Sequence, residues 1–135
     1  VAIKEASGDI SQIAAISHLC GDSIDIYSGN DDQIVPVLSL GGKGVISVLS
    51  NLLPRETSQI CHSFLNGDVK TARDMQLEYL PLINSLFCEV NPIPVKAAMS
   101  AMGYGSNILR LPLTPMEEAK KNRLISDMRN CGIKF

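Results

Sequence analysis

The segment VAIKEA (residues 1–6) is the first of three short apolar runs, and SIDIYS (23–28) and GVISVL (44–49) follow it. Their centres, near residues 3, 26 and 46, lie 23 and 20 residues apart. A strand, a helix of about ten residues and short loops fill such a repeat, which is the βα unit of a parallel sheet. Strands buried on both faces of a parallel sheet have continuous apolar runs, as these segments do. The sequence therefore predicts an α/β fold with three parallel strands.

Helical patterns occupy the two connections between these runs. Ser7-Gly8-Asp9 has the residue types of a turn and a helix N-cap, and apolar residues then recur at helical spacing as far as Cys20. Gly21 follows, in the position where glycine commonly ends a helix. A second helix is predicted over residues 31–40, where two glycines stop it.

After residue 50 no strand pattern returns, and the remaining chain predicts four helices. Pro81 should kink the second of them, since proline removes a backbone donor inside a helix. Pro94 suits the first position of the third helix. Residues 114–117, Thr-Pro-Met-Glu, have the form of a capping box at the start of the fourth.

The composition limits the class of protein. The chain has 135 residues, the size of one domain, and its 45% hydrophobic and 19% charged residues exclude a disordered chain. A net charge of -2 without a basic cluster argues against nucleic acid as a partner. No apolar run approaches the roughly 18 residues of a membrane span, and Lys4 and Glu5 interrupt the first run, unlike a secretory signal. We therefore expect a cytoplasmic protein with no membrane association.

Neither the cysteines nor the glycines form a known ligand motif. The four cysteines are too far apart for a zinc knuckle or a redox pair, so free thiols in a reducing compartment are predicted. The segment Gly41-Gly42-Lys43-Gly44 superficially resembles a phosphate loop, but it precedes a strand instead of opening a helix. We therefore expect no metal and no cofactor.

Three parallel strands leave two sheet edges open, and complete folds of this kind normally have more strands. The pattern fits the last three βα units of a (β/α)8 TIM barrel in residues 1–66, followed by a C-terminal helical region in residues 67–135. The chain also opens on Val1-Ala2-Ile3 without a polar lead-in. We therefore expect a piece of a larger protein, whose isolated copies self-associate through exposed apolar surface.

Lys4 is the strongest catalytic candidate. It lies near the C-terminal end of a predicted buried strand, and this end is the active-site face of a (β/α)8 barrel. A lysine held in an apolar barrel mouth loses stabilisation of its ammonium form, which makes its amine nucleophilic and suits Schiff-base formation with a 2-oxo acid. From position alone, a lysine that extends to solvent at a strand end is an equally good interpretation.

Gly29 and Ile46 occupy similar places on the other two strands, where main-chain groups can line a small-molecule pocket. Spacing alone favours simpler interpretations, an ordinary loop glycine and a core isoleucine. Glu5 and Asp31 are candidate acid/base groups, for which a buried salt link or a helix-terminal charge is the simpler interpretation.

Five segments together carry a family resemblance: VAIKEASG (1–8), YSGND (27–31), LGGKGVISV (40–48), NPIPVK (91–96) and LRLPL (109–113). In this order and spacing they resemble the dihydrodipicolinate synthase family of pyruvate-dependent class I aldolases. The resemblance covers essentially the whole chain but only the C-terminal half of the family's sequence. The segment 91–96 favours this family over N-acetylneuraminate lyase and the sugar-acid aldolases.

The resemblance implies a (β/α)8 barrel, usually a homotetramer, that condenses pyruvate with aspartate 4-semialdehyde in the diaminopimelate route of lysine biosynthesis. It places the Schiff-base lysine at Lys4, the main chain of the pyruvate site at Ile46 and Gly29 beside it. The helix ending at Leu40 would contribute to a subunit interface. Asn30 stands where some relatives carry Asp.

The family's N-terminal half supplies the proton relay, the arginine that holds the second substrate's carboxylate and the lysine-binding site. Loss of one general acid/base group can cost on the order of 10² to 10⁴ in rate. We therefore expect the isolated chain to be inactive in the full condensation.

Two alternatives stay open beside a synthase fragment. The half-barrel could be a non-catalytic module that self-associates through its exposed sheet edge. It could also be part of a sibling lyase that cleaves a sugar acid, such as N-acetylneuraminate, through the same lysine.

Overall fold

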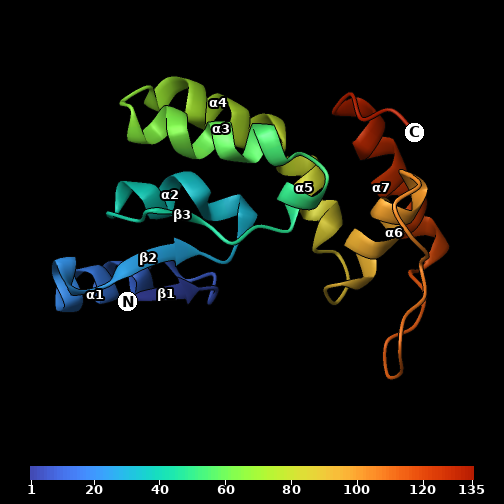
Figure 1. The fold of residues 1–135 in the computed structure, drawn as a ribbon, viewed down its shortest axis with the longest axis horizontal. Helices are drawn as coiled ribbons and strands as arrows, with labels where there is room; N and C mark the ends of the chain where they lie inside the picture. The colour runs from blue at the N-terminus through green and yellow to red at the C-terminus, as the bar shows by residue number, and fades with distance from the viewer. The chain divides into compact units, whose positions relative to one another are not determined.

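The computed structural model describes residues 1–135, and Figure 1 traces their path. The chain divides into two compact units, Val1–Glu78 and Tyr79–Phe135. The first unit extends past residue 66 because α4 (Val69–Glu78) packs along α3 (Pro54–Leu65), as the ribbon shows. The helical region expected from residue 67 onward therefore begins inside the first unit.

The sheet of the first unit has three parallel strands in the order β1-β2-β3. β1 (Ala2–Glu5) pairs with β2 (Asp25–Ser28), so that Lys4 lies opposite Tyr27. β3 (Gly44–Val45) pairs with the last two residues of β2. The predicted α/β class with three parallel strands is confirmed. Because the strands are parallel, their carboxyl ends lie at one edge of the sheet.

The first helix, α1 (Ile10–Cys20), begins and ends as the sequence predicts. The Asp9 carboxylate accepts a hydrogen bond from the free amide of Ser11 at 2.8 Å, which caps the helix. Gly21 ends the helix with a φ of 51°, in the left-handed region that glycine adopts readily.

Aliphatic side chains attach α1 and α2 (Ile34–Ser39) to the sheet. Ile13 of α1, Ile26 of β2 and Val37 of α2 are buried together. Fully burying an aliphatic side chain of this size contributes about 1.5–3 kcal/mol. The partly buried residues Ile3, Ile16 and Leu40 pack against these three.

The third strand is shorter than predicted. The sequence predicts a strand over residues 44–49, but β3 ends after two residues and a short 3-10 helix (Leu49–Asn51) follows. The carboxylate of Asp31 explains the difference, since its Oδ2 accepts hydrogen bonds from the amides of Val48 at 2.9 Å and Leu49 at 3.0 Å. Amides bound in this way cannot pair with a neighbouring strand.

Gln76 of α4 completes the polar surroundings of Asp31. Its Nε2 donates to the Asp31 carbonyl oxygen at 2.8 Å, and its Oε1 accepts from the Val35 amide at 3.3 Å. Asp31 is fully buried and Gln76 is 5% exposed. One buried polar cluster therefore connects α4, the turn after β2 and the start of α2.

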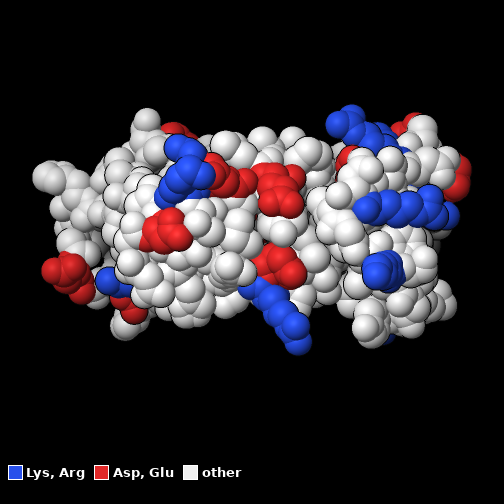
Figure 2. Space-filling view, turned by 90° about the horizontal axis from the view of Figure 1, so that it is seen from above, with Lys and Arg blue, Asp and Glu red and all other residues white.

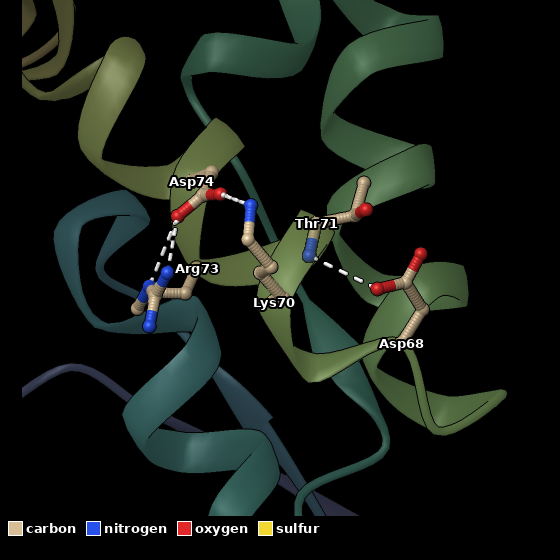
Figure 3. A network of polar contacts seen from close by, with 5 residues as sticks. All are labelled: Asp68, Lys70, Thr71, Arg73 and Asp74. Atoms are coloured by element: carbon tan, nitrogen blue, oxygen red, sulfur yellow. Dashed lines mark hydrogen bonds and ion pairs between the residues drawn. The ribbon is translucent and has the colours of Figure 1, made fainter.

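Exposed residues at the start and along α4 form a network of polar contacts, which Figure 3 shows. Lys70 and Arg73 both pair with Asp74 at 2.7 Å, and Asp68 accepts a hydrogen bond from the Thr71 amide at 3.1 Å. The hydrogen bonds from Lys70 and Arg73 lower the pKa of Asp74, and those from Thr71 lower the pKa of Asp68. Exposed ion pairs contribute little to stability, so this network is a solvated helix surface.

The second unit contains three helices, α5 (Leu80–Leu86), α6 (Ile93–Ala101) and α7 (Glu118–Asn130). Helix α7 packs against both of the others. Leu124 and Met128 of α7 are fully buried, as expected for its apolar stripe.

Several helix boundaries differ from the prediction. The long helix expected to kink at Pro81 is instead two helices, because Pro81 is the second residue of α5, where no helical partner exists for an amide. Pro94 is likewise the second residue of α6, not the first. The capping box at residues 114–117 does not form: Glu117 precedes α7 without a side-chain cap, and its amide donates to Glu89 at 3.1 Å. Five α-helices therefore follow the sheet, not four.

The surface carries small groups of mixed charge. In the view of Figure 2, Lys and Arg side chains lie near Asp and Glu side chains, with uncharged surface between the groups. None of the helices is long and apolar enough to cross a membrane. None of the four cysteines forms a disulfide.

Shortening Ile13 should destabilise the first unit. Ile13 is 1% exposed, so Ile13→Ala leaves a cavity and should lower the free energy of unfolding by about 2–5 kcal/mol. Leu19 on the same helix is 80% exposed, and Leu19→Ala should change the free energy of unfolding by no more than about 0.5 kcal/mol. Urea unfolding followed by circular dichroism measures both, and equal losses would contradict the assigned core.

Candidate active site

The carboxyl edge of the sheet brings together the three site residues expected from the sequence. Lys4 is the penultimate residue of β1, Gly29 directly follows β2 and Ile46 directly follows β3. Backbone hydrogen bonds hold these positions level, since the Gly29 amide donates to the Glu5 carbonyl at 2.6 Å and the Ile46 amide to the Ser28 carbonyl at 2.8 Å. This edge is where α/β folds bind their ligands.

Lys4 and Gly29 are in direct contact. A Cβ atom on Gly29 would lie 2.9 Å from Cε of Lys4, so the methylene stem of the lysine passes over bare backbone. The Lys4 side chain is exposed within this chain, in contrast to the enclosed apolar mouth expected from the sequence. Its amine is therefore open to small carbonyl compounds. Exposure also fits a lysine that extends to solvent, the alternative that position alone leaves open.

Ile46 presents its main chain at this edge. Its side chain is 52% exposed, so it is not a core residue. Its amide is bound to Ser28, while its carbonyl oxygen accepts no hydrogen bond within the chain. A carbonyl in this state can accept a hydrogen bond from a bound ligand.

Glu5, a candidate acid/base residue, has a structural role. It is 6% exposed, and its carboxylate accepts hydrogen bonds from the Ser7 amide at 3.1 Å and from Gln12 Nε2 at 3.0 Å. The carboxylate thereby ties the end of β1 to the first turn of α1. With its lone pairs engaged, it is not placed to transfer protons at Lys4.

Asp31, the other candidate acid/base residue, is also structural. Its carboxylate is inside the unit, bound to the amides of Val48 and Leu49. Burial raises the pKa of Asp31 above its ordinary value of 3.8, although the hydrogen bonds from these amides oppose the rise. Asp31 begins the 3-10 helix Asp31–Gln33, as its helix-terminal interpretation expects, but its carboxylate binds the amides at the start of another 3-10 helix, Leu49–Asn51.

A cavity of about 330 Å³ lies between β3 and α3, and none of Lys4, Gly29 and Ile46 lines it. Burial, together with the charge of Asp31, raises the pKa of the Cys61 thiol, which keeps it protonated and unreactive. This cavity was not predicted from the sequence. The spacing of residues on one face of α3 could have indicated it. That face contributes Pro54, Ser58, Cys61 and Leu65, spaced three or four residues apart.

The glycine-rich segment before β3 has a packing role. A Cβ atom on Gly42 would lie 2.8 Å from the Val37 carbonyl oxygen, so α2 packs directly on the backbone there. No group of three or more His, Cys, Asp or Glu side chains is placed to hold a metal ion.

A protein family and individual relatives match this chain over nearly its whole length. Residues 1–130 match the model of the dihydrodipicolinate synthetase family. The 4-hydroxy-tetrahydrodipicolinate synthase of Clostridium perfringens is 57% identical over 133 residues, which is 98% of this chain and 46% of the relative. The chain thus spans about half the length of the curated relatives it matches.

Solved structures also match nearly the whole of this chain. The dihydrodipicolinate synthase of Thermotoga maritima superposes with a TM-score of 0.94 at 39% identity, over 99% of this chain and 46% of that one. The enzyme of Acinetobacter baumannii, solved as a complex with pyruvate, superposes with a TM-score of 0.92 at 36% identity, over 98% and 45% of the two chains.

The raised pKa of Asp31 predicts a pH dependence of stability. The folded state binds the Asp31 proton more tightly than the unfolded state, so stability falls as pH rises from about 3.8 through the raised pKa. Asp31→Asn removes this titration. Urea unfolding between pH 3 and 7 should therefore show that the wild type loses stability relative to the variant as pH rises, then levels off.

The difference between wild type and variant cancels the titration of the other carboxylates. A relative stability of the wild type that grows with pH, or stays constant, would contradict the assignment.

Proposed function

The chain belongs to the dihydrodipicolinate synthetase family and corresponds to the C-terminal half of its members, and from this we propose that it supplies the Schiff-base lysine of a pyruvate-dependent synthase. The complete enzyme would condense pyruvate with aspartate 4-semialdehyde in lysine biosynthesis. The names of the relatives support this reaction over that of a sugar-acid lyase. The observation that carries the proposal is the exposed Lys4 amine at the carboxyl edge, in contact with Gly29 and at the same edge of the sheet as Ile46.

In the proposed reaction, the uncharged Lys4 amine attacks the ketone carbon of pyruvate, and loss of water leaves an imine. A proton then leaves the methyl carbon and gives an enamine. The enamine carbon forms the new bond to the aldehyde carbon of aspartate 4-semialdehyde, whose oxygen takes up a proton. Attack of water, or of the amino group of the second substrate, on the imine carbon finally breaks its bond to the Lys4 nitrogen, which takes up a proton and leaves. No cofactor or metal enters these steps.

The main chain at Gly29 and Ile46 would form the floor of the pyruvate site. The Ile46 carbonyl is unpaired within the chain and lies at the same sheet edge as Lys4. Gly29 has no side chain, so the lysine stem itself lies against its backbone. The Lys4 amine at the end of this stem is exposed and open to a small 2-oxo acid.

The chain alone should form the imine far more readily than it completes the condensation. The two acidic residues nearest this edge, Glu5 and Asp31, are bound in structural hydrogen bonds. Proton transfer would then depend on groups from the remaining half of the family fold. The absence of a positioned general acid or base lowers a reaction rate by a factor of about 10² to 10⁴.

The proposal also concerns partners and location. A homo-oligomer is expected, because the outer edges of β1 and β3 are unpaired within this chain and offer surface for subunit contacts. The substrates are small molecules, neither nucleic acid nor membrane takes part, and the reaction is assigned to the cytoplasm.

Pyruvate with sodium borohydride should label Lys4. Reduction of the imine leaves a stable adduct, which peptide mass mapping would locate at Lys4 in the wild type and would not find in Lys4→Arg. Lys43→Arg is the matched control, because Lys43 is also exposed and directly precedes β3. Adducts spread over many lysines, or an adduct that survives in Lys4→Arg, would contradict the assignment.

Adding the missing part of the fold should restore synthesis. The N-terminal half of the Clostridium perfringens relative, mixed with this chain, should raise product formation from pyruvate and aspartate 4-semialdehyde by about 10²-fold or more over either half alone. Lys4→Arg in the same mixture should abolish the gain. No activity in a mixture that forms a complex, with the full-length relative active in parallel, would contradict the proposal.

A further inference from the structure

Position 29 is occupied by glycine because no space is left for a side chain, and not because the backbone needs a positive φ. Its φ lies outside the left-handed region that favours glycine. A Cβ atom there would lie 2.5 Å from Cβ of Ala6, 2.9 Å from Cε of Lys4 and 3.1 Å from the carbonyl oxygen of Glu5. All three atoms belong to the segment that carries the reactive lysine. That segment therefore closes the position to any side chain.

Hydrogen bonds fix the backbone on both sides of this contact. The Gly29 amide donates to the Glu5 carbonyl at 2.6 Å. The Ser28 hydroxyl donates to the Asn30 carbonyl at 2.8 Å and accepts from the Asn30 amide at 3.2 Å, which closes the turn around Gly29. On the β1 side, the buried Glu5 carboxylate accepts from Gln12. The flexible stem of Lys4 is thus the most easily displaced of the three neighbours.

We propose that Gly29 is a positioning residue for Lys4, which allows the methylene stem to lie along the end of β2 and so fixes where the amine is presented. The inference rests on the proposed function, since it concerns the same lysine. It differs from substrate lining, because the effect of Gly29 passes through the lysine and does not require contact with pyruvate.

The physical reason is the flexibility of lysine. A free lysine side chain has many rotamers, and support along its stem removes part of this freedom before the substrate arrives. Displacing a reacting group by about 1 Å can lower a rate on the order of 10²-fold. A side chain at position 29 would force such a displacement of Cε.

The test separates displacement of the lysine from general strain. Gly29→Ala alone would also collide with Ala6, so the informative variant is the double substitution Gly29→Ala/Ala6→Gly, with Ala6→Gly as its reference. Gly44→Ala is the matched control. It adds the same methyl group at a buried glycine of the neighbouring strand, where the nearest side-chain atom is Tyr27 Cε1 at 3.3 Å and not Lys4.

Two readouts are needed on the full chain. Nuclear Overhauser effects between the Lys4 ε-protons and the Gly29 α-protons report the contact without any activity. Borohydride trapping at increasing pyruvate reports the capture rate at saturation separately from the half-saturating concentration. A residue that only lines the substrate site would change the half-saturating concentration and leave the saturated rate and the lysine contact unchanged.

We expect the contact in the wild type, its loss in the double variant and a capture rate at saturation lowered by about tenfold to 10²-fold. Ala6→Gly and Gly44→Ala should keep the wild-type rate. A double variant that captures pyruvate at the rate of Ala6→Gly, a comparable loss in Gly44→Ala, or no contact in the wild type would overturn the inference. If the wild type forms no adduct at all, the proposed function fails for this chain, and the presence or absence of the contact alone decides the role of Gly29.

Discussion

The buried carboxylate of Asp31 is the interaction on which the first unit depends. It holds the amides of Val48 and Leu49, while its own carbonyl is bound by Gln76 of α4. Burying a carboxylate is costly, and the two amides offset this cost at Oδ2 only, because Oδ1 is buried without a hydrogen-bond partner. By capturing two amides just beyond β3, Asp31 stops the strand and turns the chain toward α3. β3 ends level with Ser28, the last residue of β2, and Asp31 fixes the chain two residues beyond Ile46.

The candidate site consists mainly of backbone. Only Lys4 contributes a reactive side chain, and around it the structure offers the bare backbone of Gly29 and the carbonyl of Ile46. The nearby carboxylates are used to fix loops and strand ends, Glu5 for the turn before α1 and Asp31 for the turn after β3. This division explains how a chain can hold a nucleophile in a defined place without holding groups that move protons.

Local pattern was enough to predict the α/β class, the parallel strands, the cap at Asp9 and the collection of Lys4, Gly29 and Ile46 at one edge. Each depends on residues adjacent in sequence or on the period of a strand. The early end of β3 was not predictable, because the carboxylate responsible lies 17 residues earlier in the chain. The start of α7 was missed for a similar reason, since the Glu117 amide binds Glu89, 28 residues away. The contacts of Glu5 and Gly29 depend on distances in the folded chain, which the spacing of residues in the sequence does not contain.

β1 carries its packing and its chemistry on opposite sides. Ile3 packs against the core and Glu5 is buried, while Lys4 between them is exposed. A strand paired one residue out of step would exchange these faces, placing an ammonium group among aliphatic side chains and an isoleucine at the site. Such a molecule would have neither an exposed Lys4 at this edge nor a stable core. One register of the sheet therefore decides both the packing of the core and the accessibility of the lysine.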